Sequence, residues 1–411
     1  MAHESHGTTT PAPGGRLATS TRSTLLGAMF LMATSAIGPG FITQTTTFTV
    51  RLGAAFAFAI VISILVDIAL QLNVWRVIGV SGRRAQELGN LVAPGLGWVM
   101  AAFLLVGGLV FNIGNVAGSG LGLDAMLGLD PKLGGALSAL IAIGIFLSKK
   151  AGVAVDRIVV VLGIAMIALT AYIAITSGPP VGQALKNVVL PEQVDFLAIT
   201  TLVGGTIGGY IVYAGAHRLL DSGVSGADHV RDITRGSITG ILITAVMRVV
   251  LFLAILGVVA GGAALDPASP AASAFQQAAG EVGLRVFGIV LWAAAITSVI
   301  GASYTSVSFV TSRTTSDRTR TLLVVAFIAV TTAVYLLIGT APTTLLVFAG
   351  AFNGLLLPIG IAVLLWVATR RTDLLNGYRY PRWLLVIGWV AWLLTLFLAV
   401  RSVQPVIDLF R

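Results

Sequence analysis

Long apolar runs recur along the whole chain, and short polar segments separate them. A helix needs about 20 predominantly apolar residues to cross a bilayer, and it satisfies its backbone hydrogen bonds internally. The pattern predicts eleven transmembrane helices, at residues 24–50, 54–78, 95–117, 133–148, 157–177, 196–216, 237–262, 283–310, 321–340, 342–368 and 383–402. The predicted fold class is therefore an all-α integral membrane protein, with a polar tail at 1–22 and a transmembrane domain at 23–411.

Composition supports this prediction and narrows the function. Hydrophobic residues make up 56% of the 411 residues and charged residues only 10%, whereas soluble domains are about 25% charged. The chain has no cysteine, which excludes disulfides and thiolate metal ligands. No connection between spans is long enough for a soluble domain, so we expect a function within the membrane. We expect no enzymatic activity and no cofactor.

The basic residues predict the orientation of the chain. With the N-terminus in the cytoplasm, most Lys and Arg residues fall in the inner connections, as in Arg83, Arg84, Arg370 and Arg371. This bias follows the positive-inside rule, so the net charge of +9 indicates orientation and not a nucleic-acid partner. We predict a multi-pass protein of the cell membrane whose N-terminus is cytoplasmic and whose C-terminus lies outside.

Two of the predicted spans contain residues that disfavour a continuous helix. The first contains Gly38-Pro39-Gly40, and the sixth reads LVGGTIGGYIVYAGAH, with glycine at positions 204, 205, 208 and 209. The two lie five spans apart, as expected if the segment 24–177 is repeated in inverted orientation by 196–368, with 383–402 as an extra helix. Such glycines can simply let helices pack closely. Paired interruptions at corresponding positions instead favour a transporter that holds a solute at mid-membrane.

Five segments occur in an order that points to a known family. They are IGPGFIT (37–43), AIVISILVDIALQLNVWRVIGVSGR (59–83), VFNIGNVAGSGLGLDAMLG (110–128), GGTIGGY (204–210) and NGLLLPIGIAVLL (353–365). Together they resemble the NRAMP family of proton-coupled divalent-metal transporters, in particular its divergent bacterial relatives. The resemblance implies a LeuT-type fold of two inverted five-helix repeats with broken first and sixth helices. It also implies secondary active transport of a divalent metal cation by alternating access.

The residues that bind metal in that family are replaced in this chain. The family's first-span aspartate, followed by Pro-Gly-Asn, falls in TQTTTFTVRLG, and no acidic residue occurs between Glu4 and Asp67. Its sixth-span Met-Pro-His falls on 208–210, and its third-span acidic pair falls on two asparagines. The resemblance thus implies a substrate site built from neutral residues, with no metal ligand set assigned. The candidates are Gly38, Gly40, Thr43, Gln44, Thr45, Thr46, Thr47, Asn112, Asn115, Gly208, Gly209 and Tyr210.

Few charges remain at membrane depth, and each is a candidate for function because a buried charge is costly there. Arg248 lies within the seventh predicted span, where it could snorkel to the inner interface, pair with Asp67 or balance an anionic solute. Asp67 lies in the middle of the second span and is the candidate for proton coupling, with a structural partner as the alternative. His217 follows the sixth span, as an interfacial residue or a proton relay.

The eighth predicted span is rich in hydroxyl groups, in the segment TSVIGASYTSVS (297–308). Serine and threonine often donate hydrogen bonds to carbonyls of their own helix, which explains such a segment without any function. Ser298 and Ser303 are nevertheless candidates for lining the transport pathway, because the eighth span lines it in this fold class.

Two cargoes fit these residues, and the choice between them stays open at this point. The family resemblance favours a divalent cation, whereas the neutral site and Arg248 favour a small organic carboxylate or amino-acid-like solute. A divalent cation needs oxygen or nitrogen ligands to replace its water, and amides and hydroxyls alone would hold a hydrated Mg²⁺ weakly. The expected partners are the lipid bilayer, one such solute and a coupling proton or sodium ion.

Overall fold

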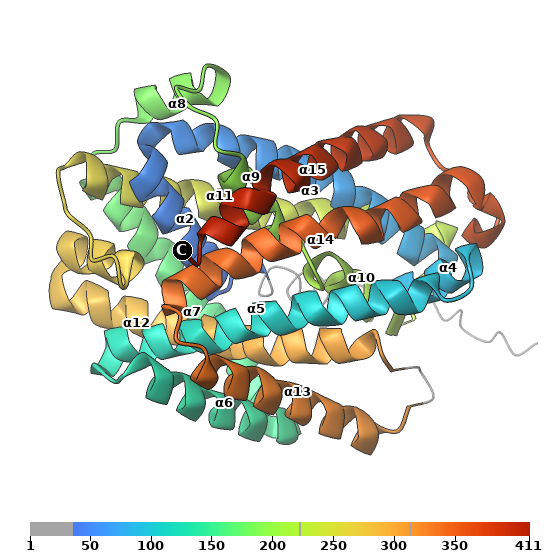
Figure 1. Cartoon of the computed structure of the whole chain (residues 1–411), viewed down its shortest axis with the longest axis horizontal. Helices are drawn as coiled ribbons and strands as arrows, with labels where there is room; N and C mark the ends of the chain where they lie inside the picture. Colours follow the sequence, from blue (N-terminus) through green and yellow to red (C-terminus); the bar gives the residue numbers. More distant parts are fainter. Residues whose placement is uncertain (1–35, 222, 312–314) are drawn as a thin grey trace, which may run out of the picture.

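The computed structural model describes residues 36–221, 223–311 and 315–411, without the side chains of 149–161. Within these residues the chain is helical and contains no strand. Most of the long helices run along the long axis of the molecule (Figure 1). The predicted tail at 1–22 and the first residues of the first predicted span lie outside the described residues.

A helix corresponds to each of the eleven predicted spans. These helices are α2 (Pro39–Leu52), α3 (Phe56–Ser81), α5 (Leu96–Leu127), α6 (Pro131–Leu147), α7 (Lys149–Thr176), α9 (Phe196–Ile207) with α10 (Ile211–Asp221), α11 (Val230–Ala260), α12 (Pro270–Ser308), α13 (Asp317–Leu337), α14 (Pro342–Arg370) and α15 (Arg382–Asp408). Eight helical segments of the described chain are long and apolar enough to cross a membrane, and two of them combine α2 with α3 and α9 with α10. The predicted all-α membrane fold is confirmed.

Several short helices lie in segments that the sequence analysis treated as connections. They are η1 (Gly53–Ala55), α4 (Ala85–Val92), α8 (Val181–Val189), η2 (Ala227–His229) and η3 (Thr372–Leu375). The helix α7 and the short α8 meet at an angle of 101°. These helices have three to nine residues, which is too short for an apolar pattern to distinguish them from loops.

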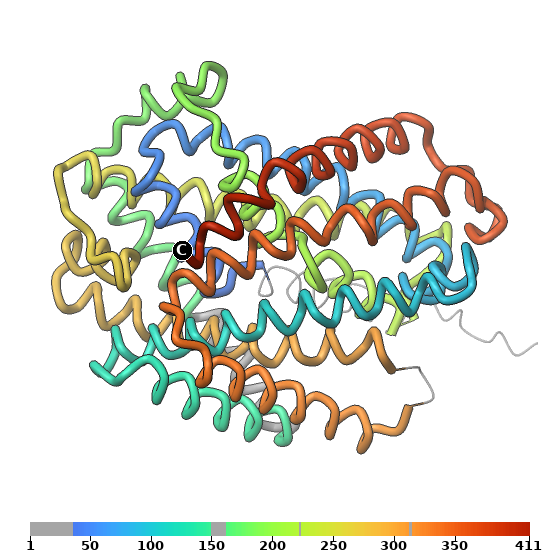
Figure 2. The backbone as a smooth tube through the Cα atoms, viewed as in Figure 1, coloured from blue at the N-terminus to red at the C-terminus, as the bar shows by residue number. Residues whose placement is uncertain are grey.

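The helix α5 lies in the middle of the bundle and packs against α6, α12, α13 and α14. In the view of Figure 2, α6 and α13 form one side of the bundle, and α3 and α15 form the other. The helices α9 and α14 approach especially closely, because glycines face each other where they cross. A Cβ atom at Gly204 would collide with the backbone of Gly350 and Gly354. At these positions the glycines serve close packing.

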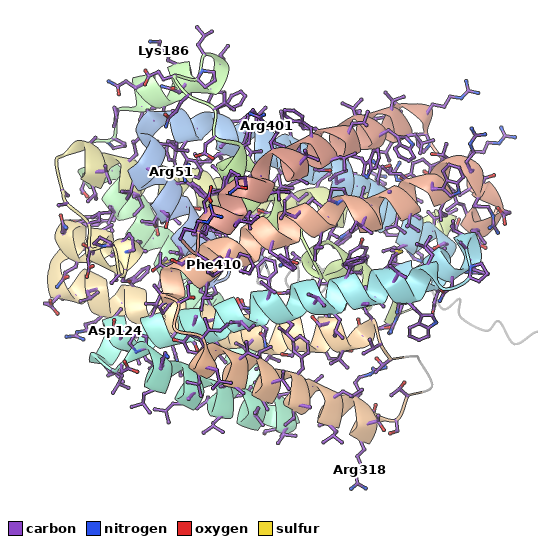
Figure 3. All side chains as sticks on the ribbon, viewed as in Figure 1. Arg51, Asp124, Lys186, Arg318, Arg401 and Phe410 are labelled. Carbon is purple, nitrogen blue, oxygen red and sulfur yellow. The ribbon has the colours of Figure 1, made fainter. Side chains whose placement is uncertain are left out.

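Three exposed basic residues mark two opposite ends of the bundle. Figure 3 shows Arg51 and Lys186 toward the end opposite Arg318. The positive-inside rule assigns Arg51 and Lys186 to the outer side and Arg318 to the inner side. The two groups of residues are thus separated along the bundle, and the direction in which the bundle crosses the membrane remains a prediction.

Candidate solute-binding site

The first broken span is interrupted immediately before Pro39. Ile37 and Gly38 are bent, Gly38 is extended (φ −100°, ψ −171°), and α2 starts at Pro39. Proline suits the first position of a helix, because its fixed φ is helical and its missing N–H has no acceptor there. The backbone N–H groups of the first turn of α2 therefore face the break and give this end a partial positive charge.

The polar stretch that follows is helical and buried. Thr43–Thr47 lies in the middle of α2 and is not part of an unwound segment. The hydroxyl groups of Thr45 and Thr46 donate to the carbonyls of Phe41 and Ile42, at 2.7 and 3.0 Å. These two threonines are thus satisfied by their own helix, which is the common arrangement of threonine within a membrane helix.

Gln44 connects three helices at the centre of the bundle. Its side chain is fully buried, and its Nε2 donates to the carbonyl of Leu346 at 2.9 Å. A Cβ atom at Gly205 or at Gly350 would collide with the Gln44 amide, so glycine makes room for it on α9 and on α14. The Gln44 Oε1 atom has no hydrogen-bond partner among the described residues. This arrangement leaves one buried acceptor free between α2, α9 and α14.

The second broken span is interrupted at Gly208–Tyr210. Gly208 is extended (φ −70°, ψ 164°) and ends α9, and Gly209 has a φ of +54°. A Cβ atom at Gly209 would also collide with the Oδ1 atom of Asn353 on α14. Glycine is therefore required at this position by both backbone conformation and space. The interruption agrees with the sequence prediction of a broken sixth helix.

Asn115 on α5 lies between the two interruptions. Its Oδ1 atom lies 3.7 Å from the position that a Cβ atom of Gly38 would occupy, and Ser298 Oγ lies 2.8 Å from the same position. On its other side Asn115 lies beside the phenol of Tyr210, which is fully buried. Neither Asn115 Nδ2 nor Tyr210 Oη has a hydrogen-bond partner in the part of the chain that the structure describes. Gly38, Ser298, Asn115 and Tyr210 thus form one polar group between the broken helices.

Asn112, one turn earlier on α5, has different neighbours. Its Nδ2 donates to Ser303 Oγ at 3.1 Å and to Thr331 Oγ1 at 3.0 Å. The Ser303 hydroxyl in turn donates to the carbonyl of Val299 at 2.7 Å. Asn112 and Ser303 thus belong to a hydrogen-bonded network between α5, α12 and α13, next to the polar group at the interruptions.

A second buried group contains the two charges at membrane depth. Arg248 is 2% exposed, and its Nη1 donates to Thr206 Oγ1 at 2.9 Å. Its guanidinium lies over the ring of Phe41, 4.4 Å from the ring centroid. Asp67 is 1% exposed and lies near both Arg248 and Thr206, although no direct ion pair joins Asp67 and Arg248 among the described residues. The structure thus places opposite charges on α3 and α11 around one hydroxyl of α9.

His217 lies inside α10 and not in a loop. It is 3% exposed and packs against the rings of Tyr213 and Phe309, with centroid distances of 6.1 and 5.0 Å. Its Nδ1 lies 3.5 Å from the hydroxyl of Ser308. His217 is therefore part of the packing between α10 and the end of α12.

The groups that face the two interruptions are neutral. Those without a hydrogen-bond partner among the described residues are Gln44 Oε1, Asn115 Nδ2, Tyr210 Oη and Asn353 Oδ1. A buried polar atom without a partner is costly, so such atoms mark a place for a solute or for water. Nowhere in the described chain do three or more His, Cys, Asp or Glu side chains come together as a metal site.

Three residues of these groups are not among those predicted from the sequence. Asn353 stood in one of the quoted segments, and a lone amide within an apolar span is a signal that could have identified it. Thr206 and Phe41 gave no such signal, because threonine and phenylalanine are ordinary in membrane helices. Their positions beside Arg248 depend on how three helices pack.

Comparison with known proteins places this arrangement in a family. A family model described as natural resistance-associated macrophage protein-like (Nramp) matches residues 29–404. A relative from Bacillus subtilis, the uncharacterized membrane protein YcsG, is 52% identical over 367 residues, which cover 89% of this chain and 90% of the relative. An uncharacterized membrane protein of Haemophilus influenzae is 49% identical over 390 residues, which cover 95% and 98%.

Solved structures show the same fold at low sequence identity. A mutant of the Eremococcus coleocola manganese transporter superposes with a TM-score of 0.73 at 19% identity, over 98% of this chain and 90% of that chain. The structure of MhsT in complex with L-phenylalanine superposes with a TM-score of 0.66 at 16% identity, over 91% and 98%. These likenesses confirm the predicted LeuT-type fold with broken first and sixth helices.

Proposed function

The chain belongs to the Nramp family, and from this membership we propose that it is a secondary active transporter whose first candidate cargo is a divalent metal cation. The family model covers residues 29–404. Structural neighbours that share the fold over 98% of the chain are named manganese transporters. Together they make a membrane transporter the function that the fold supports best, in preference to an enzyme.

We place the cargo between the interruption before Pro39 and the interruption at Gly208–Tyr210. The single observation that carries this proposal is the position of Asn115, which lies beside the first interruption on one side and beside Tyr210 of the second on the other. In this class of transporter, solutes bind where two half-helices end near the bilayer midplane. Carbonyls freed by the interruptions and the amide and hydroxyl groups beside them would supply the contacts to the cargo.

The chemistry of these groups restricts which cation could bind. They are neutral oxygen and nitrogen atoms, and a divalent cation bound only by such ligands keeps part of its water shell. Mg²⁺ retains water more readily than Mn²⁺ does, and soft thiolate or thioether ligands that would select other metals are not among the groups that face the interruptions. If the cargo is a metal, we expect weak selectivity and a hydrated ion.

One observation favours a second candidate, a small organic carboxylate or amino-acid-like solute. The N-terminus of α2 points its free N–H groups at the interruption, and the first turn of α2 contains no acidic residue. Such a helix end favours a carboxylate and disfavours a cation. Arg248 would assist if its guanidinium reached the cargo, because its Nε and Nη2 atoms have no hydrogen-bond partner among the described residues.

We propose that Asp67 and Arg248 serve coupling to a proton or a sodium ion. A carboxylate buried at membrane depth is the usual carrier of a coupling proton, and this one lies near a buried guanidinium. Movement of α9 would change the contacts that Thr206 makes with both charges. His217, inside α10, is a weaker candidate because its contacts are those of packing.

Isothermal titration calorimetry on the purified protein tests the cargo. The titrants are Mn²⁺, Mg²⁺ and a panel of small carboxylates, each applied to the unaltered protein and to Asn115→Ala and Arg248→Gln. Asn115→Ala should weaken binding of the true cargo about tenfold, which corresponds to a loss of about 1.4 kcal/mol of binding free energy. Thr395→Ala, a buried hydroxyl on α15 away from the interruptions, is the matched control and should leave binding unchanged.

The two variants separate the candidates. Metal binding that survives Arg248→Gln, with no heat from any carboxylate, supports the metal. Carboxylate binding that is lost in Arg248→Gln, with no heat from either metal, supports the organic solute. Binding of either cargo that is unchanged in Asn115→Ala would contradict the position proposed for the site.

A further inference from the structure

A groove of about 680 Å³ lies between α3 and the first turns of α11. Three arginines line it: Arg76 from α3, and Arg231 and Arg235, one turn apart on α11. Asp228 also lines the groove, so the net charge of these four side chains is positive. The groove belongs to the end of the bundle that the sequence analysis assigns to the inner side, and it is distinct from the interruptions of the first and sixth spans.

Arg76 lies in this groove and forms no ion pair with a carboxylate among the described residues. It is 7% exposed, and its Nη2 donates to Thr234 Oγ1 at 2.6 Å. Its Nε atom is buried and has no hydrogen-bond partner in the described part of the chain. A buried cation without a partner is costly, because desolvation is not offset by attraction to an opposite charge. The arrangement therefore calls for an anion.

The face of α11 that lines the groove continues as an exposed apolar stripe. Leu242, Ile243 and Val246 follow Arg235 and Thr239 at helical spacing, and they are 48%, 43% and 62% exposed. Val230 and Ile238 line the groove itself. An apolar stripe on the outside of a transmembrane helix contacts acyl chains. A ligand that has both an anionic group and an acyl chain would thus match the whole surface.

We propose that this groove binds the phosphate group of an anionic phospholipid from the leaflet at that end of the bundle. The phosphate accepts hydrogen bonds from Arg76, Arg231 and Arg235, and an acyl chain lies along the α11 stripe. Clustered arginines between transmembrane helices at the cytoplasmic side are typical of sites for acidic headgroups. The arginine fork suits phosphate oxygens, which it can contact through two parallel hydrogen bonds. This site is independent of the cargo proposed above.

Native mass spectrometry of the purified full chain tests the proposal. The probes are phosphatidylglycerol, phosphatidylcholine with the same acyl chains, and inorganic phosphate, each titrated in detergent. Phosphatidylglycerol should bind more tightly than phosphatidylcholine. Arg231→Gln with Arg235→Gln should weaken its binding about 30-fold, the effect expected from losing two basic charges near an acidic headgroup.

Two further variants make the test specific. Arg318→Gln with Arg370→Gln also removes two exposed arginines from the same end of the bundle, outside the groove, and should leave binding unchanged. Thr239→Trp fills the groove without removing a charge and should weaken binding of phosphatidylglycerol. Equal loss in the Arg318/Arg370 control would overturn the proposal, as would equal binding of the two lipids. Displacement of phosphatidylglycerol by millimolar inorganic phosphate would show that the groove binds a soluble anion and would overturn the proposal of a lipid site.

Discussion

Gly209, where the sixth span is interrupted, has a backbone conformation and a close contact that only glycine accommodates. Its φ is +54°, and a Cβ atom there would collide with Asn353 Oδ1. We expect Gly209→Ala to lose most transport activity and to lower the free energy of unfolding by about 2 kcal/mol or more. The left-handed conformation alone costs a non-glycine residue about 1–2 kcal/mol, and displacement of Asn353 adds to it. Uptake by proteoliposomes and unfolding in mixed micelles measure the two effects.

Gly223→Ala is the matched control for this substitution. Gly223 has a φ of +80° and open space around the position of a Cβ atom, so only the backbone strain is shared. We expect Gly223→Ala to lower stability by about 1 kcal/mol and to retain transport. Equal loss of transport in both variants would mean that backbone strain, and not the contact with Asn353, is responsible.

Asp67 and Arg248 allow a second prediction at the scale of single residues. Removing one charge of a buried pair leaves the other without compensation, which costs about 3–5 kcal/mol in known cases. We expect Arg248→Gln to lower the free energy of unfolding by about 3 kcal/mol. We expect Arg248→Gln combined with Asp67→Asn to be clearly less destabilised than the sum of the two single variants. Unfolding in mixed micelles measures this double-mutant cycle.

The matched control for that cycle is Arg248→Gln combined with Thr395→Ala, because Thr395 hydrogen-bonds within α15. The effects of these two changes should add within about 0.5 kcal/mol. Additivity in the Asp67/Arg248 cycle as well would mean that the two charges do not interact, and Arg248 would then be free to serve an anionic cargo.

At the scale of helices, both interruptions could be predicted from the sequence, whereas the conformation of the polar stretch after the first one could not. Four glycines in one apolar run predicted the interruption at Gly208–Tyr210, because glycine lowers helix stability and permits positive φ. The sequence predicts that the threonines after Gly38-Pro39-Gly40 belong to the solute site but does not fix their conformation, and the structure places Thr43–Thr47 inside the helix α2. Hydroxyls that donate to carbonyls four residues earlier let threonine stay in a buried helix, and this choice depends on packing around α2.

Arg84 connects three helix ends at the side of the bundle that the sequence analysis assigns to the cytoplasm. It is 2% exposed, and its Nη2 contacts Asp221 Oδ1 at the end of α10, at 2.7 Å. Its Nη1 donates to the carbonyl of Ser308, the last residue of α12, at 2.9 Å and to that of Thr311, which follows the helix, at 3.3 Å. These contacts hold α10, one half of the broken sixth span, against α12. In alternating access that half-helix has to move, so we expect these contacts to keep the inner side closed.

Because the chain contains no cysteine, a single introduced cysteine can report whether the inner side is closed. A single reporter, Ser298→Cys, lies beside the first interruption and is 1% exposed. We expect Arg84→Gln to increase about tenfold the rate at which a maleimide labels this cysteine from the inner side. This increase corresponds to a loss of about 1.4 kcal/mol from the free energy that favours the closed state. Arg371→Gln is the control, because it breaks an exposed ion pair with Asp373 at the same end. An unchanged rate in Arg84→Gln would contradict a closing role.

At the scale of the whole molecule, the fold was easier to predict than the cargo. Eleven apolar runs and two interruptions five spans apart are redundant signals, so an error in one run leaves the architecture unchanged. The cargo depends on a few atoms, such as Asn115 Nδ2 and Gln44 Oε1, whose neighbours come from distant segments of the chain. The same signals support the inverted repeats that we propose at 24–177 and 196–368, because each repeat contains one of the two broken helices.

The orientation of the whole bundle gives the last prediction. Lys186 and Arg318 are exposed basic residues toward opposite ends of the molecule (Figure 3). Because most Lys and Arg residues fall on the side of Arg318, we expect that side to be cytoplasmic. In otherwise cysteine-free protein, a membrane-impermeant maleimide should label Lys186→Cys in intact cells and Arg318→Cys only after permeabilisation. Each variant removes one positive charge, so the pair is matched. If only Arg318→Cys were labelled in intact cells, the orientation would be opposite to the predicted one. The arginine groove and the Arg84 contacts would then lie on the outer side.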